Sequence, residues 1–321
     1  MATIRVGVLR GGMSPEYEVS LRSGGNVLKH LPNDMKGRDV LITKDGAWHL
    51  GGILMSPARV ADQVDVFFNA LHGAYGEDGK IQRTLDALGV PYTGSRALPS
   101  SIAMAKHLSK RYYDRYGIKT PIAKVVRNVG VIEEKAKEIF ETMSPPWIVK
   151  PAGAGSSFGV RIARSYRELV EAFLQAFAYG DVALVEEFIK GKEATCCVVE
   201  HHNGSLSALP PIEIRPPVGA SFFDYEVKYN GQTREICPGD FTSEEAEKIM
   251  EMAEDAHFAL GLSHYSRSDF IVSSSRGIYI LETNNLPGLT NESLIMKALK
   301  AVGINFTEFL EHVIHLARRK K

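Results

Sequence analysis

The sequence predicts an α/β fold with a doubly wound parallel sheet in its N-terminal part and α+β parts after it. The first observation is the order strand, glycine turn and helix over residues 4–20, which is the layout of a doubly wound domain. The second is the return of that order at the strand Val64–Phe68 and the helix Lys80–Leu88. The third is the later pairing of strands through a short turn, between Phe270–Val272 and Ile278–Leu281, which predicts an antiparallel hairpin.

Composition limits the class of protein. The chain has 321 residues, of which 44% are apolar, enough for two or three domains with ordinary cores. Lys and Arg together number 38, as do Asp and Glu, so no net charge favours binding to nucleic acid or to a membrane surface. No apolar run reaches the roughly 18 residues of a spanning helix, and the start Ile4–Leu9 is typical of a buried strand rather than a signal peptide. Cys196, Cys197 and Cys237 form no CxxC pair, which argues against a disulfide framework or a zinc site. We therefore expect a soluble cytoplasmic protein.

The first glycine turn leads into a helix whose first residues face the ligand crevice. Ser14 is expected to cap this helix, with Pro15 at its first position. The pair Gly11-Gly12 is not a GxGxxG fingerprint, so it does not predict dinucleotide binding, and it can be a tight turn and nothing more. Glu16 would lie at the N-terminal end of the helix, beside the crevice where such domains bind ligands, and is the first candidate site residue.

The loop after the second strand, residues 69–79, returns to the same edge of the sheet. It contains His72, which is either a polar surface residue or a ligand contact. The helix Lys80–Leu88 then buries one apolar face. Val90–Ser95 is typical of a short strand and turn, so the first domain is expected to end at residue 96.

Two lysines and a Gly/Ser loop predict a phosphate site in the middle of the chain. A helix over Ser100–Tyr116 carries Lys106, and Lys150 stands at the end of a strand. The loop after Lys150 contains Ser156 and Ser157 and leads into another strand, so it is not a P-loop, whose glycines precede a helix. Its backbone N–H groups and serine hydroxyls would suit phosphates, with Lys150 as a point charge. The alternative is a plain hairpin.

The following strand, Ala183–Ile189, is a candidate binding site for a nucleotide base. The helix before that strand opens with a capping box at Ser165 and closes at Gly180. The residues expected to point inward from this helix are Leu169, Val170, Phe173, Leu174 and Phe177. A strand that passes between domains with free backbone groups commonly holds adenine, and Glu193 would then meet the ribose. The pattern alone does not separate this from an ordinary strand.

The C-terminal part begins with a buried strand, Glu193–Val199, which makes its two cysteines core residues. The loop Pro216–Asp240 is long for a compact domain, and such loops are commonly lids. A capping box at Thr242 opens a helix that runs to Leu260, and a last helix covers Asn305–Arg319.

The C-terminal hairpin brings acidic side chains together. Its short turn would place Asp269 beside Glu282 and Asn284. Side chains alternate along a strand, so Glu282 and Asn284 share a face and the residue between them points the other way. Two carboxylates and an amide oxygen suit Mg²⁺, which takes one or two protein carboxylates and completes its shell with water and phosphates. The alternative is a surface hairpin with scattered charge. Against it stands the turn Pro287-Gly288, which could present backbone N–H groups to a ligand.

Taken together, these stretches resemble the ATP-grasp superfamily and, within it, the D-alanine–D-alanine ligases. The resemblance covers nearly the whole chain, in order. The motifs that carry it are Gly11–Ser20, His72–Gly79, Pro91–Gly94, Val149–Pro151, Gly155–Gly159, Glu186–Glu193, Asp224–Tyr229, Arg267-x-Asp269, Glu282-x-Asn284 and Pro287-Gly288. The resemblance implies an N-terminal α/β domain (residues 1–96), a central ATP-grasp subdomain (97–187) and a C-terminal ATP-grasp subdomain (188–321).

The activity implied by the resemblance is the ATP-dependent ligation of two D-alanines to D-alanyl-D-alanine, for peptidoglycan precursor synthesis. One D-alanine carboxylate would attack the γ-phosphate to give an acyl phosphate, and the amine of the second D-alanine would displace phosphate. ATP would be the co-substrate and two Mg²⁺ ions, or Mn²⁺ in their place, the cofactors. The family's usual homodimer is expected as well.

The family's functional residues match positions of this chain. The metal ligands would be Asp269, Glu282 and Asn284. The ATP-binding residues would be Lys106, Lys150, Ser156, Ser157, Glu186, Glu187, Phe188, Ile189, Glu193 and Lys228. The residues around the two D-alanines would be Glu16, His72, Arg267, Gly288, Ser293 and Leu294. The resemblance also implies an oxyanion hole made by Arg267 and the Gly288 N–H. It further implies a hydrogen-bonded triad of Glu16, Ser156 and Tyr229 that ties the lid loop to the site.

Three positions depart from the family's pattern. Ala105 replaces the Asp that usually precedes the phosphate lysine, Asn285 replaces a usual Thr, and Phe223 stands where an aromatic hydroxyl is common. None of them removes a metal ligand or a phosphate lysine, so an active enzyme is expected.

Three other functions stay open. The first is a D-alanine–D-lactate or D-alanine–D-serine ligase, against which Tyr229 counts, because depsipeptide relatives tend to replace this tyrosine. The second is an ATP-grasp ligase for another carboxylate and amine, which would be expected to lack the pair Glu16 and His72. The third is a nucleotide-binding protein without activity, in which loss of a metal ligand would be expected.

Overall fold

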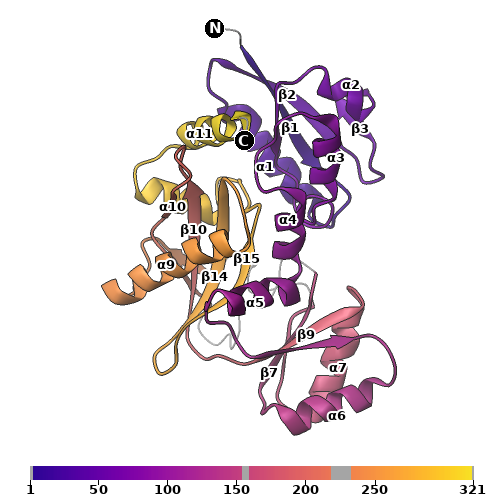
Figure 1. The fold of residues 1–321 in the computed structure, drawn as a ribbon, viewed down its shortest axis with the longest axis vertical. Helices are drawn as coiled ribbons and strands as arrows, with labels where there is room; N and C mark the ends of the chain where they lie inside the picture. The colour runs from indigo at the N-terminus through magenta and orange to yellow at the C-terminus, as the bar shows by residue number, and fades with distance from the viewer. Residues whose placement is uncertain (1–2, 154–158, 218–232, 320–321) are drawn as a thin grey trace.

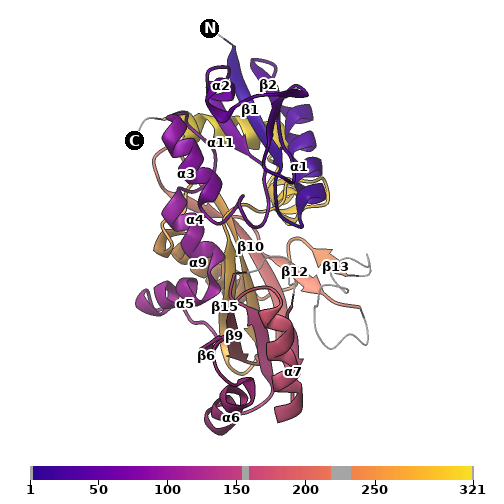
Figure 2. The ribbon, with the colours of Figure 1, turned by 90° about the vertical axis from the view of Figure 1, so that its right-hand side faces the viewer.

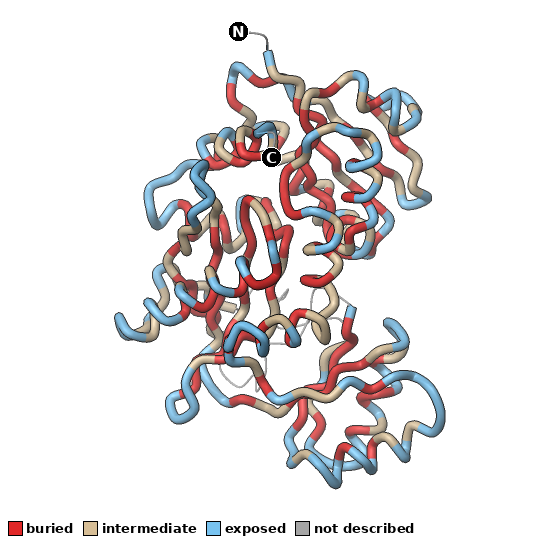
Figure 3. Tube along the Cα trace, in the orientation of Figure 1, coloured by how far each residue is buried: buried red, intermediate tan, exposed pale blue. Residues whose placement is uncertain are grey.

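The computed structural model describes residues 3–153, 159–217 and 233–319, and these residues form three sheets (Figure 1). The sheets follow one another along the long axis of the molecule. The N-terminal sheet lies at one end, the C-terminal sheet in the middle and the central sheet at the other end. Buried residues follow the strands of each sheet, while the connections are mostly exposed (Figure 3).

The N-terminal sheet has the strand order β4-β3-β2-β1-β5. Its strands are β1 (Ile4–Gly11), β2 (Met35–Ile42), β3 (Trp48–Leu50), β4 (Ile53–Leu54) and β5 (Val66–Asn69). Its helices are α1 (Tyr17–His30), α2 (Pro57–Ala61) and α3 (Lys80–Leu88). The strand β1 runs parallel to both β2 and β5, as predicted, whereas β3 and β4 pair antiparallel at the β2 edge, so the sheet is mixed. The predicted second strand is therefore the fifth, because β2, β3 and β4 were not foreseen.

The start of α1 differs from the prediction. Its N-cap is Glu16 and no side chain caps it, so the predicted capping by Ser14 is wrong. Ser14 instead accepts a hydrogen bond from the Glu16 N–H (3.1 Å) and donates one to the carbonyl of His72 (2.6 Å). The hydroxyl thus joins the first turn of the domain to the His72 loop rather than closing the helix.

The helix predicted over Ser100–Tyr116 is two helices, α4 (Ala97–Met104) and α5 (Lys106–Arg115). The break falls at Ala105, whose ψ of 89° leaves the helical region. The N–H of Lys106 donates to the carbonyl of Ala152 (2.9 Å), at the end of the central sheet, and not to an earlier turn of helix. This contact starts α5 beside the loop that follows Lys150. Figure 2 shows α4 and α5 connecting the N-terminal sheet to the rest of the molecule.

The central sheet is antiparallel in the order β6-β9-β7-β8. Its strands are β6 (Ala123–Arg127), β7 (Trp147–Pro151), β8 (Arg161–Ala163) and β9 (Val182–Glu187). The helices α6 (Ile132–Thr142) and α7 (Tyr166–Phe177) pack on it around the buried Trp147 and Phe173. The hydroxyl of Ser165 caps α7 as predicted. Leu174 is 56% exposed, so the prediction that it points inward is wrong: the buried stripe of α7 continues through Ala172 and Ala176 instead.

The C-terminal sheet has the order β13-β12-β10-β14-β15, with β11 paired to β10. Its strands are β10 (Lys192–Glu200), β11 (Leu206–Ala208), β12 (Ile212–Arg215), β13 (Arg234–Ile236), β14 (Tyr265–Ser273) and β15 (Gly277–Asn284). Its helices are α9 (Ser243–Ala259), α10 (Leu294–Ala301) and α11 (Phe306–Arg318). The capping box predicted at Thr242 opens α9. The strand β13 lies inside the segment that was predicted to be a loop without secondary structure.

The last helix, α11, packs against the N-terminal sheet. Val313 and Leu310 of α11 share one apolar core with Val8 of β1 and Phe68 of β5. This core couples the N-terminal sheet to the C-terminal elements and fixes their relative position. Cys196 and Cys197 are fully buried in β10, as predicted for core residues, and burial raises the pKa of the Cys197 thiol to about 12. Every helix among the described residues is too short or too polar to cross a lipid bilayer.

Candidate active site

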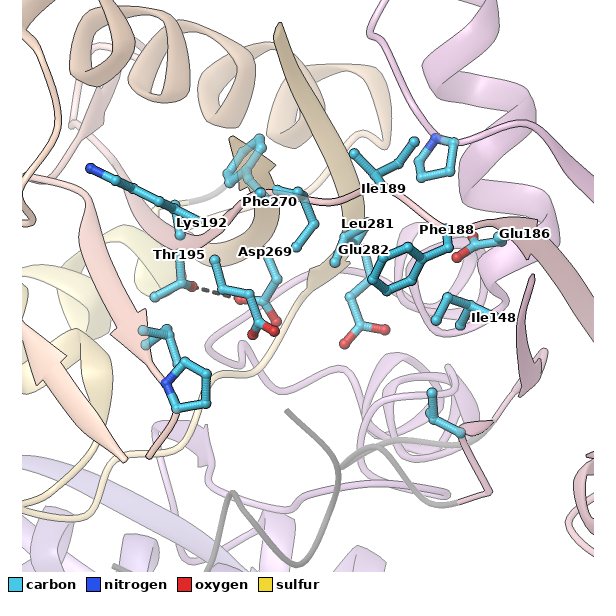
Figure 4. Close-up of a pocket in the computed structure, with 18 of the residues that line it drawn as sticks. Ile148, Glu186, Phe188, Ile189, Lys192, Thr195, Asp269, Phe270, Leu281 and Glu282 are labelled. Atoms are coloured by element: carbon cyan, nitrogen blue, oxygen red, sulfur yellow. Dashed lines mark hydrogen bonds between the residues drawn. The ribbon is translucent and has the colours of Figure 1, made fainter. Parts of the chain in front are cut away.

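A cavity of about 490 Å³ lies where the central and C-terminal sheets face each other (Figure 4). Its walls come from β7 and β9, the connection from β9 to β10, and the strands β10, β12, β14 and β15. The predicted site residues that line it are Lys106, Lys150, Glu186, Glu187, Phe188, Ile189, Glu193, Arg267, Asp269, Glu282 and Leu294. Residues up to 188 positions apart in the sequence, from Lys106 to Leu294, therefore line one cavity.

One end of the cavity is built around a buried carboxylate. Glu186 is 2% exposed at the end of β9, and its two oxygens pair with Lys110 and Lys150, each at 2.8 Å. Burial alone would raise the pKa of Glu186, but the two ammonium groups outweigh it and lower that pKa. Burial lowers the pKa of Lys110, with Glu186 opposing the shift. The carboxylate therefore stays ionised and held in place. Residues 187–189, which follow it in the sequence, also line the cavity.

Lys110 was missed in the sequence, although one signal for it exists. It follows Lys106 by four residues, which places both lysines on one face of α5. Lys110 also donates to Thr120 Oγ1 (2.5 Å) and to the Pro121 carbonyl (3.1 Å). Thr120 in turn donates to the carbonyl of Ile280 in β15 (2.9 Å). The ammonium of Lys110 therefore joins β9 to the C-terminal hairpin.

The other end of the cavity carries the predicted pair of carboxylates. Asp269 of β14 lies directly opposite Glu282 of β15, which confirms the predicted register of the hairpin. Figure 4 shows both carboxylates directed the same way, into the cavity. Glu282 Oε2 lies 3.0 Å from Lys106 Nζ. A lysine, and so a positive charge, thus stands beside the acidic pair.

Two partners hold Asp269 in place. Arg267 donates from Nε and Nη2 to its two oxygens, each at 2.9 Å, and Thr195 Oγ1 donates to Oδ1 at 2.6 Å. Burial would lower the pKa of Arg267, but the Asp269 carboxylate outweighs it and raises that pKa. The fork of hydrogen bonds fixes the plane of the carboxylate. Thr195, in the neighbouring strand β10, was not foreseen, because its contact depends on strand pairing.

The alternation predicted for β15 is present. The Thr283 hydroxyl is buried and accepts from Tyr113 Oη (2.8 Å), on the side opposite the cavity. Asn284 Oδ1 accepts a hydrogen bond from the Leu286 N–H (2.9 Å), and Asn284 is not among the cavity-lining residues. An amide oxygen has two lone pairs, so this bond is compatible with a metal contact.

The residues predicted to hold amino-acid substrates form a second group, around the loop of residues 72–79. His72 is 5% exposed, with Nε2 2.9 Å from Ser23 Oγ and Nδ1 3.8 Å from Glu77 Oε1. The carboxylate of Glu16 lies against the same loop, since a Cβ added at Gly73 would come within 2.5 Å of Glu16 Oε2. The φ of +70° favours glycine at this position, and a side chain there would also displace the Glu16 carboxylate.

Gly288 and Ser293 lie together in the turn after β15. A Cβ added at Gly288 would lie 3.1 Å from Ser293 Oγ, and Ser293 is the N-cap residue of α10. Its hydroxyl oxygen accepts from the Thr290 N–H at 2.9 Å. Neither Gly288 nor Ser293 lines the cavity, whereas the adjacent Leu294 does.

Several predicted residues lie outside the described part of the chain. These are Ser156, Ser157, Phe223, Lys228 and Tyr229. Of the two other departures from the family's pattern, Ala105 is the residue at which the helix breaks. Asn285 is 1% exposed, and its Nδ2 lies 3.4 Å from the Glu77 carbonyl.

The donor set at the acidic end fits a hard divalent cation that binds together with phosphates. Nowhere in the described ranges do three His, Cys, Asp or Glu side chains gather as a complete metal site. Asp269 and Glu282 offer two carboxylates on adjacent strands, which is the number Mg²⁺ takes when phosphates and water supply its other ligands.

Comparisons with known proteins agree with this geometry. The model of the D-ala D-ala ligase C-terminus matches residues 113–315 and that of the D-ala D-ala ligase N-terminus matches residues 51–95. The chain is 40% identical to the D-alanine--D-alanine ligase of Geobacter sulfurreducens, over 100% of this chain and 96% of the relative. It is similar in structure to the VanG D-Ala:D-Ser ligase of Enterococcus faecalis (TM-score 0.87, 29% identity, covering 98% of this chain and 99% of the other). D-alanyl-alanine synthetase A of Vibrio cholerae is equally similar (TM-score 0.87, 29% identity, covering 99% of each). The chain therefore belongs to the D-alanine–D-alanine ligase family and has its ATP-grasp fold.

Proposed function

We propose that this chain joins two D-alanine molecules to D-alanyl-D-alanine at the expense of ATP, a cytoplasmic step in making peptidoglycan precursors. The observation that carries this proposal is one cavity that combines the fixed Glu186 at one end with the facing carboxylates of Asp269 and Glu282 at the other. Lys106 and Lys150 line the same cavity. A nucleoside triphosphate needs three features in this order: a surface that binds the base, positive charge beside the phosphates, and a metal site.

In this proposal the nucleotide lies along the cavity. The Glu186 carboxylate and the backbone of Glu187, Phe188 and Ile189 hold the adenine, and Glu193 binds the ribose. Lys106 and Lys150 contact the phosphates, together with Lys228, Ser156 and Ser157 of the undescribed segments. Phosphoryl transfer depends on positioning and on neutralising charge more than on covalent help, which matches this set of residues.

Asp269, Glu282 and Asn284 would hold Mg²⁺, in the two-ion arrangement expected for the family, with Mn²⁺ as an alternative. When bound, the metal neutralises charge on the β- and γ-phosphates of ATP. Arg267 and Thr195 keep the Asp269 carboxylate in one orientation, so the ligand is preorganised before the nucleotide arrives.

The reaction takes place in two steps. A carboxylate oxygen of the first D-alanine attacks the γ-phosphorus, the bond to the β-phosphate oxygen breaks, and ADP leaves. The amine of the second D-alanine then attacks the acyl carbon of the resulting D-alanyl phosphate. The tetrahedral intermediate expels inorganic phosphate, and the amine loses a proton to give the peptide bond.

The protein's part in the second step is to place both amino acids and to stabilise the oxyanion. Glu16 anchors the ammonium of the first D-alanine, with His72 near its carboxyl group. Ser293 and Leu294 bind the carboxylate of the second. Arg267 and the Gly288 N–H donate to the developing oxyanion. The triad of Glu16, Ser156 and Tyr229 would tie the lid over the acyl phosphate and exclude water.

The direct test measures phosphate release by the purified protein with ATP, Mg²⁺ and D-alanine. We expect release with D-alanine alone and a product with the mass of D-alanyl-D-alanine, and no release with L-alanine. Parallel reactions with D-alanine plus D-serine or D-lactate test the second substrate, which matters because the VanG D-Ala:D-Ser ligase is a structural relative. A mixed product in place of the dipeptide would assign the chain to that branch. Sedimentation at assay concentration tests the expected homodimer.

Replacing Lys110 with methionine is expected to raise the KM for ATP roughly 10-fold while kcat changes less. The substitution keeps an unbranched apolar stem and removes the ammonium group, so Glu186 retains one of its two buried ammonium partners and the adenine contact loses its fixed position. ATP kinetics at saturating D-alanine measure this effect. The control is Lys137→Met, an exposed lysine paired with Glu141, for which both constants should stay unchanged. An unaltered KM for ATP in Lys110→Met would contradict the role given to Glu186.

A further inference from the structure

A buried serine of α1 lies between the two halves of the amino-acid site. Ser23 is fully buried, and its Oγ lies 2.9 Å from His72 Nε2 and 3.2 Å from the backbone N of Leu289. His72 belongs to the loop after β5, and Leu289 directly follows Gly288 in the turn after β15. One hydroxyl group therefore touches two segments that are more than 200 residues apart in the sequence.

The direction of these hydrogen bonds follows from the chemistry of the groups. A backbone N–H can only donate, so Ser23 Oγ accepts from Leu289 and its own proton is free to point at His72 Nε2. On the other side of the imidazole, Nδ1 faces Glu77 Oε1 at 3.8 Å, and a carboxylate favours a proton on the nitrogen that faces it. Of the two neutral tautomers, both contacts favour the one that carries its proton on Nδ1.

The turn after β15 is held by α1 at a second point. Asn26 Nδ2 donates to the Leu289 carbonyl at 2.8 Å, three residues along α1 from Ser23 and hence on the same face of that helix. Ser23 and Asn26 thus engage the N–H and the C=O of Leu289. The N–H of Leu289 belongs to the peptide between Gly288 and Leu289, so the serine holds the peptide that directly follows the Gly288 N–H.

We propose that Ser23 is a positioning residue. It holds the first D-alanine subsite in a fixed arrangement with the turn after β15, which carries the proposed oxyanion donor, the Gly288 N–H. It does so by donating to His72 and accepting from Leu289. This inference rests on the proposed function, which places His72 beside the first D-alanine and the Gly288 N–H at the oxyanion. Peptide bond formation needs the acyl carbon and the oxyanion donors in register, and a displacement of about 1 Å costs roughly 100-fold in rate.

The test is the variant Ser23→Ala, which removes the hydroxyl and places a better helix former in α1. We expect kcat/KM for D-alanine to fall roughly 10- to 100-fold, since the loss of position is partial. The KM for ATP should stay within about 2-fold of the wild type, because the ATP cavity does not include Ser23. Equal losses toward ATP and D-alanine, or none, would overturn the proposal.

A matched control separates positioning from the general cost of removing a buried hydroxyl. Ser100 is also fully buried in a helix, α4, and donates to the Ser95 carbonyl at 3.2 Å. Ser100→Ala should keep wild-type kinetics toward both substrates. A loss toward D-alanine as large as that of Ser23→Ala would reduce Ser23 to a structural residue and overturn the inference.

The second measurement needs no turnover. Nitrogen-15 NMR of the imidazole rings distinguishes the two neutral tautomers, and the His72→Gln variant identifies the His72 signals among the 10 histidines. The wild type should show a proton on Nδ1 of His72, and Ser23→Ala should shift this signal toward a mixture of tautomers. An unchanged His72 signal in Ser23→Ala would contradict the proposal. Inactivity of the wild type toward D-alanine, with the tautomer shift present, would instead contradict the proposed function alone.

Discussion

Glu282→Ala is expected to lower the rate of dipeptide formation on the order of 1,000-fold, because metal-assisted charge stabilisation is worth several kcal/mol. Glu282 lies opposite Asp269 on the hairpin and faces Lys106 at 3.0 Å, so the substitution removes one of the two carboxylates of the proposed metal site. Its side chain is 34% exposed, lines the cavity and belongs to none of the apolar clusters that contain hairpin residues. The fold should therefore survive.

The measurement compares phosphate release across a range of Mg²⁺ concentrations, together with the thermal unfolding midpoint. We expect an unchanged midpoint and a rate that stays low even at high Mg²⁺. Glu254→Ala is a suitable control, since Glu254 is a carboxylate of α9 that accepts from the Ala208 N–H (2.7 Å) away from the cavity. Near-normal turnover of Glu282→Ala would remove the basis for a metal site at the hairpin.

The hairpin itself could be predicted with its register because local rules determine it. A short polar turn between two apolar runs sets which residues pair, and alternation sets which face each side chain takes. Asp269 and Glu282 therefore met as expected, although a bulge follows Asp269. A candidate site whose residues belong to one hairpin can therefore be predicted from the sequence.

The strands β2 to β4 were missed for the opposite reason. β2 carries Lys36, Arg38 and Asp39 among its residues, so it has neither a continuous apolar run nor a regular alternation. Its place in the sheet depends on pairing with β1 and on the contact between Arg10 and Asp39 (2.6 Å). Tertiary contacts supply what the local pattern lacks.

The break in the helix at Ala105 has the same kind of cause. Residues 100–116 have ordinary helix formers and no Pro or Gly before residue 117, so nothing local predicts an interruption. The N–H of Lys106 donates to the carbonyl of Ala152, almost 50 residues later, and not to a carbonyl of the preceding helical turn. The Lys110–Glu186–Lys150 cluster likewise joins three separate elements, α5, β9 and β7. From the sequence, Lys150 was predicted as a charge at a strand end beside a phosphate loop and Glu186 through the family resemblance, but their pairing was not predicted.

Arg267→Lys is expected to lower kcat roughly 100- to 1,000-fold, the cost of removing one oxyanion donor from an active site. The substitution keeps the positive charge but not the planar fork, which now donates to both oxygens of Asp269 at 2.9 Å. Two effects follow from one change: the proposed oxyanion hole loses a donor, and the proposed metal ligand Asp269 loses its fixed plane. The KM for ATP should change much less than kcat, since the proposed adenine site lies on β9, away from Arg267.

A control with the same geometry separates these effects from the general cost of replacing a forked ion pair. Arg5 donates to both oxygens of Asp65, at 2.7 and 3.2 Å, on the first strand of the N-terminal sheet. Arg5→Lys should therefore keep wild-type kcat, with any loss confined to stability. Steady-state kinetics and the Mg²⁺ dependence of both variants measure the difference. If Arg267→Lys raised only the Mg²⁺ requirement and kcat recovered fully at high Mg²⁺, Arg267 would orient Asp269 and take no part in binding the oxyanion.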